Sequence, residues 1–101
     1  MGTGGKREEV DAKIRAWESE LERLRLALAA APDAVHAAHH QRFVALYRQK
    51  EIVKSRWEVL RGAYQPTPEV SQRFAEAFAA MEDAWAAAGS LRTEVLAGSP
   101  V

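Results

Sequence analysis

The sequence predicts an all-α protein, a three-helix antiparallel bundle of the coiled-coil type. Apolar residues recur at alternating spacings of three and four, which is the period of helices that bury one stripe. Prolines at 32, 66 and 68 divide the chain into three such segments. The length of 101 residues fits one domain. We therefore expect a single helical unit over 6–97, with flexible ends at 1–5 and 98–101.

The first segment predicts a helix over about 6–30. Charged residues fill the spaces between its apolar positions and face water. Pro32 cannot donate a backbone hydrogen bond and disfavours a helical Ala31, so the helix ends or kinks there. The expected apolar stripe is Val10, Ile14, Trp17, Leu21, Leu24, Leu28 and Ala31.

The second segment predicts a helix over 33–63, with Asp33 helping to start it. Lys50 occupies one position of its apolar stripe, so we expect the amine either to reach water or to form a polar layer that fixes the register. The stripe is Phe43, Leu46, Val53, Trp57, Leu60 and Tyr64, broadened by Val35, Val44, Tyr47, Ile52 and Val59.

The third segment predicts a helix over 68–88. Thr67 can cap it, Pro68 suits the first turn, and Glu69 complements the helix dipole. Gly89 and Ser90 end or interrupt the helix, and the sequence allows one further helical turn over 91–96. The stripe of the third helix is wide enough to touch two neighbours: Val70, Phe74, Ala77, Phe78, Met81, Ala84, Trp85 and Ala88.

Short connections between these helices predict an up-down-up arrangement with two mixed layers. The rival arrangement straightens the Pro32 junction into one long kinked helix. In the bundle, the first layer joins Trp17, Leu46, Tyr47 and Trp85, and the second joins Val10, Trp57 and Phe74. The residues expected to form the core or an interaction surface are Trp17, Leu46, Tyr47, Trp57, Phe74, Phe78 and Trp85.

Two stretches carry a resemblance. The segment from Ile14 to Leu24, with Trp17 three residues after Ile14, resembles the opening helix of a family of short bacterial coiled-coil proteins. In that family two aromatic residues, usually both Trp, lie eleven residues apart in an Ala- and Glu-rich helix; here they are Phe74 and Trp85. The resemblance, over roughly Val10 to Ala88, implies a helical protein linked to stress responses, and it supplies no catalytic residues.

A histidine cluster lies early in the second helix. His36 and His40 are one helical turn apart and could chelate zinc or nickel, although a complete site needs further ligands. The plainer interpretation is that His36, His39 and His40 are surface or rim histidines on a helix. A third is a pH response in which acid loosens this end, because positive charge is disfavoured near a helix N-terminus.

The second helix is also basic, with Arg42, Arg48, Lys50, Lys54, Arg56 and Arg61. A nucleic-acid interface is conceivable on this face. The third helix, however, is acidic, and pairing between helices of one chain explains the charges more simply than phosphate binding.

Composition excludes several classes of function. Fourteen basic and fourteen acidic residues cancel, and there is no cysteine for thiolate chemistry. We find no glycine-rich phosphate loop, serine nucleophile setting or inward carboxylate pair. We therefore expect no enzyme, no cofactor and no small-molecule substrate. Without a signal peptide or a run of roughly 20 apolar residues, we expect a cytoplasmic protein without membrane contact.

The expected function is that of a non-enzymatic interaction or scaffold protein. The apolar stripes are wider than a single helix–helix contact needs, and a slender bundle cannot bury all of their apolar surface. The remaining apolar surface would bind another copy or a partner helix. The alternatives are a metal- or pH-responsive module at the histidines and nucleic-acid binding through the second helix.

Overall fold

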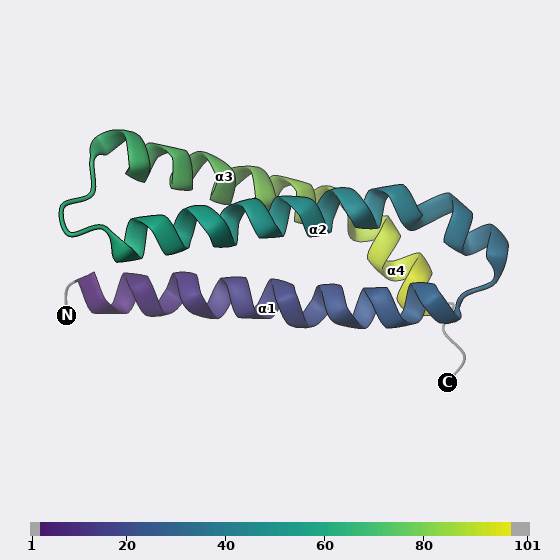
Figure 1. Cartoon of the computed structure of the whole chain (residues 1–101). Helices are drawn as coiled ribbons and strands as arrows, with labels where there is room; N and C mark the ends of the chain where they lie inside the picture. Colours follow the sequence, from purple (N-terminus) through teal and green to yellow (C-terminus); the bar gives the residue numbers. More distant parts are fainter. Residues whose placement is uncertain (1–2, 98–101) are drawn as a thin grey trace.

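A computed structural model describes residues 3–97 of the chain, and these residues form four α-helices and no strand. The helices are α1 (Thr3–Ala30), α2 (Asp33–Gly62), α3 (Pro68–Ala87) and α4 (Gly89–Ala97). Figure 1 shows α2 running antiparallel beside α1, α3 returning along α2, and the short α4 crossing back to the C-terminal end of α1. The prediction of an all-α protein is confirmed.

The N-terminal boundary differs from the prediction. Residues 3–5, expected to be flexible, belong to α1. The remaining expected flexible ends, residues 1–2 and 98–101, lie outside the described residues.

The Pro32 junction is a turn between two helices and not a kink within one. The amide of Ala31 donates to the carbonyl of Leu28 at 3.2 Å, and the amide of His36 donates to the carbonyl of Pro32 at 3.0 Å. Pro32 is extended, with φ −57° and ψ 153°, so the helical path is broken at this residue. The chain reverses, and α1 and α2 lie side by side (Figure 1).

The second break follows the predicted capping chemistry. The hydroxyl of Thr67 accepts a hydrogen bond from the amide of Val70 at 3.2 Å, Pro68 lies in the first turn, and Glu69 is the acidic residue of that turn. The hydroxyl satisfies one of the amides that a helix start leaves without a partner.

The prediction of a three-helix bundle is corrected here. The described residues contain a fourth helix, α4, where only one further helical turn was expected. The chain resumes helix directly after α3, with the amide of Arg92 donating to the carbonyl of Ala88 at 3.0 Å. Leu91 and Val95 are both buried, and α4 contacts α1, α2 and α3. Packing therefore stabilises a helix that is too short to be stable alone.

All four helices contribute fully buried side chains to the core. Trp17 and Leu28 on α1 are also nearly completely buried. The predicted stripes of the three long helices supply most of this core. Its largest fully buried side chains are Leu21, Leu24, Val53, Met81, Leu91 and Val95.

The structure contains the aromatic contact of the second predicted layer but places one residue of the first layer elsewhere. Trp57 contacts Phe74, with ring centroids 4.9 Å apart, as the second layer requires. Tyr47, expected inside the first layer, is 44% exposed, so that placement is wrong. Its ring lies against Phe43 and under the amine of Lys50, on the outside of α2.

The molecule is longer than a compact domain of its size. Its extents are 49 × 25 × 19 Å and its radius of gyration is 15.7 Å, whereas about 13 Å is typical of 100 residues in a compact fold. Less of the apolar surface is therefore enclosed.

Replacing Met81 by Ala should destabilise the fold by about 2–5 kcal/mol, because the side chain is fully buried and its removal leaves a cavity. The matched change, Leu26→Ala, removes a side chain that is 56% exposed and should alter stability by no more than about 0.5 kcal/mol. Urea denaturation measures both. Equal effects would contradict the described core.

Candidate functional site

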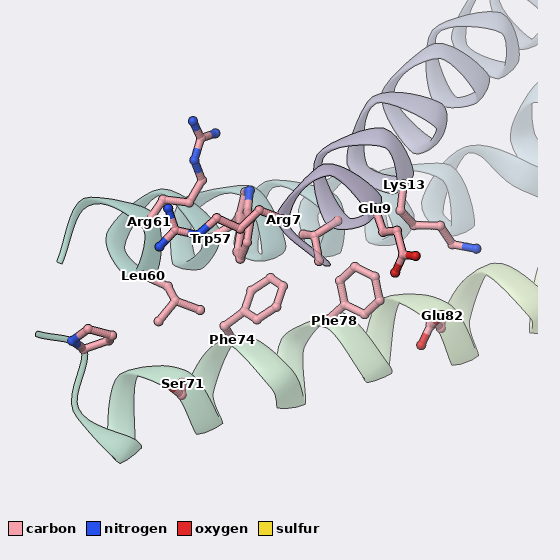
Figure 2. A pocket seen from close by; sticks show the side chains of 12 residues that line it. Arg7, Glu9, Lys13, Trp57, Leu60, Arg61, Ser71, Phe74, Phe78 and Glu82 are labelled. Carbon is pink, nitrogen blue, oxygen red and sulfur yellow. The ribbon is translucent and has the colours of Figure 1, made fainter. Parts of the chain in front are cut away.

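An open groove separates α1 from α3 at the end of the molecule away from α4. Both helices pack against α2, yet no Cα atom in the described part of α1 lies within 8 Å of a Cα atom in α3. The groove has a volume of about 860 Å³ (Figure 2). Its apolar floor consists of Val10, Trp57, Leu60, Phe74 and Phe78.

Aromatic side chains connect α1 with α3, although the backbones of these two helices do not pack together. The ring of Phe78 reaches from α3 to Trp17 of α1, with centroids 5.2 Å apart, and Phe74 lies 5.5 Å from Phe78. Tilted ring pairs of this kind contribute about 0.5–1.5 kcal/mol beyond their buried area. Trp17 is buried under this contact, whereas Phe74 and Phe78 stay partly exposed on the groove side.

A polar contact fixes the floor of the groove to α1. The indole N–H of Trp57 donates to Oδ1 of Asp11 at 2.8 Å, and Nη1 of Arg61 donates to the same oxygen at 3.3 Å. Asp11 directly follows the stripe residue Val10, and the apolar pattern of the sequence does not identify it as a site residue. This contact orients the Trp57 ring so that its apolar face lines the groove (Figure 2).

The rim of the groove carries charges of both signs. Arg7, Glu9 and Lys13 line it from α1, and Glu82 lines it from α3. Lys13 and Glu82 lie on opposite walls at the same end (Figure 2). No ion pair joins these two exposed residues within the described chain.

Lys50 forms a polar layer between α1 and α2, which confirms one of the two interpretations of this residue. Its side chain is 5% exposed, and its Nζ lies 2.5 Å from Glu51 and 3.9 Å from Oε2 of Glu18. The same Glu18 oxygen accepts a hydrogen bond from Lys54 at 3.0 Å. Two lysines of α2 thus share one carboxylate of α1, and this sharing favours a single register.

The basic residues of α2 find their acidic partners mainly in α1, not in the acidic α3 as expected. Lys54 pairs with Glu18 and Arg61 with Asp11. Toward α3, Arg56 donates only to the backbone carbonyl of Arg73, at 3.2 Å. The basic surface that remains for a polyanion is correspondingly smaller.

The three histidines do not converge on one point. The rings of His36 and His40 stack, with centroids 4.9 Å apart, while His39 is buried. Nε2 of His39 lies 3.7 Å from Oε2 of Glu94 on α4, and its Nδ1 has no hydrogen-bond partner among the described residues. The pH response of this end of α2 stays a prediction.

No group of three or more His, Cys, Asp or Glu residues that could hold a metal ion forms within the described part of the chain. Chelation by His36 and His40 alone stays a prediction.

Comparison of the chain with protein-family models, with curated proteins and with solved structures finds no match in any of the three. The resemblance to short bacterial coiled-coil proteins therefore stays a prediction. Among the described helices, none is long and apolar enough to cross a membrane.

Replacing Asp11 by Ala should destabilise the protein by about 1–3 kcal/mol, because the buried indole N–H of Trp57 would lose its acceptor. Asp11→Asn keeps an acceptor oxygen and should cost less. Urea denaturation with Trp fluorescence measures both. An Asn variant as unstable as the Ala variant would show that charge, and not the hydrogen bond, dominates.

The Lys50 contact gives a pH prediction. The hydrogen bond from Lys50 lowers the pKa of Glu51 below its ordinary 4.5, against a smaller opposing effect of desolvation. The stability that Glu51 contributes is therefore complete above pH 4.5 and is lost as the pH falls through the lower pKa of the folded state. Glu51→Gln should lose less stability than the natural protein as the pH falls below 4.5. Thermal melts of both proteins at a series of pH values measure this difference. If both lose the same amount of stability as the pH falls, the contact between Lys50 and Glu51 does not contribute as described.

Proposed function

We propose that the protein is a non-enzymatic helical interaction protein and that the groove between α1 and α3 binds a helix in a coiled-coil-like manner. The occupant is a helix of a second copy or of a partner protein. The observation that carries the proposal is the apolar floor that α1, α2 and α3 leave open.

The lack of direct packing between α1 and α3 supports a helical occupant. Each of the two helices brings Cα atoms within 8 Å of Cα atoms in α2, but α1 and α3 do not approach each other this closely along the described chain, so their facing side chains remain available to another helix. Phe74 and Phe78 are one helical turn apart on α3, so they form a ridge of the kind that fits beside the side chains of another helix.

The chemistry of the groove suits binding better than catalysis. Asp11, which contacts the floor residue Trp57, accepts hydrogen bonds from Trp57 and Arg61. The other charged groups lie on the exposed rim, where they can select the orientation of a partner. Burying an exposed Leu-sized side chain on this floor would contribute about 1.5–3 kcal/mol.

The alternatives have less support. Lys50, Lys54 and Arg61 are engaged with acidic residues of the same chain, which reduces the case for nucleic acid. His36 and His40 lack further ligands among the described residues, which reduces the case for a metal sensor. The cytoplasmic location remains part of the proposal.

Site-directed photocrosslinking tests the groove directly. A photoreactive p-benzoyl-phenylalanine replaces Ser71, which is exposed and lines the groove, or Ser55, which is exposed on α2 and does not line it. We expect irradiation in cells to join the Ser71 site to a helical segment of the same protein or of another, identified by mass spectrometry.

The Ser55 site should give no such product. If the Ser71 site gives no product beyond that of the Ser55 site, the groove is not an interaction site.

A further inference from the structure

We infer that a second copy of this chain covers the groove, and that a two-fold axis parallel to the long helices relates the two copies, so that α1 and α3 of one copy lie against α3 and α1 of the other. This inference rests on the proposed function. It follows from how the charges and the apolar residues are arranged across the groove.

The rim charges complement each other under this symmetry. Lys13 on α1 and Glu82 on α3 lie across the groove from each other at the same end (Figure 2). A two-fold axis in front of the groove and parallel to the helices sets α1 of one copy against α3 of the other without changing their level. Lys13 of each copy then faces Glu82 of its partner, and the interface contains this pair twice.

A different axis gives a different pairing. A two-fold axis that crosses the groove sets α1 against α1 and α3 against α3. Lys13 then faces the partner's α1, which carries both Glu9 and Lys13, and it does not meet Glu82. Only the parallel axis pairs Lys13 with Glu82, the opposite charges on the two walls of the groove, so we assign this axis.

The apolar floor and the overall shape fit the same arrangement. The partly exposed Phe74 and Phe78 of one copy would face the α1 wall of the other, where Val10 is also partly exposed. The short α4 packs at the opposite end of α1 and leaves the groove uncovered (Figure 1). Fourteen basic and fourteen acidic residues cancel, so no net charge repels a second copy.

Charge reversal at the rim tests the symmetry. In Lys13→Glu homodimers both rim pairs become two carboxylates, and in Glu82→Lys homodimers both become two amines. Each variant alone should self-associate about tenfold more weakly, a loss that salt reduces.

Mixing the two variants should restore association. In a heterodimer of Lys13→Glu with Glu82→Lys, both rim pairs again contain opposite charges. The double variant should also dimerise like the natural protein. Sedimentation velocity from about 1 µM to about 1 mM measures self-association, and native mass spectrometry of the mixture counts the heterodimers.

Arg15→Glu and Asp83→Lys are matched controls. They make the same charge changes on the same two helices, at exposed residues that do not line the groove. Both should leave association unchanged, and circular dichroism should show equal helix content in all variants.

Two results would overturn the inference. A natural protein that stays monomeric at every concentration excludes the second copy. Weakened single variants whose mixture does not recover exclude the parallel two-fold axis. If the Ser71 site still captures a helix of another protein, the proposed function stands without this inference; if it captures nothing, both fail.

Discussion

The shared use of α2 by the two other long helices is the constraint on which the rest of the structure depends. The apolar stripe of α2 is wide enough for α1 and α3 to lie along it side by side, and each gains its burial there. Two helices that both pack against α2 do not have to contact each other. At one end α4 adds the missing packing, through Leu91 and Val95. At the other end nothing in the described chain takes that place, and the groove remains.

Local patterns were sufficient to predict the two breaks that separate the three long helices. Proline removes a backbone donor wherever it stands, so Pro32 and Pro68 set boundaries regardless of tertiary context. Thr67 caps its helix through a contact within four residues. Residues whose environment depends on a distant element were harder to predict. His39 is buried because α4 lies beside it, and α4 itself is stabilised by that packing more than by its own sequence.

The candidate site was only partly predictable for the same reason. Trp57, Phe74 and Phe78 were identified as apolar stripe residues, and all three line the groove. The period of a sequence gives the face of a helix that is apolar, but it does not give the separation of two helices that share a third. Tyr47 shows the ambiguity at a single position. It follows the buried Leu46, and a rotation of one residue places its ring outside, over the amine of Lys50.

The unequal distribution of specific contacts explains why charge remains available on α3. The α1–α2 contact contains directional pairs: Glu18 with Lys50 and Lys54, and Asp11 with Trp57 and Arg61. The α2–α3 contact has donors to backbone carbonyls instead, from Gln49 to Ala77 and from Arg56 to Arg73. A backbone carbonyl is present at every residue, so these bonds do not require an acidic side chain. The acidic residues of α3 are therefore not needed to hold α2: Glu69 pairs with Arg73 of its own helix, and Glu82 is left on the rim of the groove. The apolar residues of α3 hold this helix against the rest of the fold through their burial. Its acidic side chains are therefore available to select a binding partner.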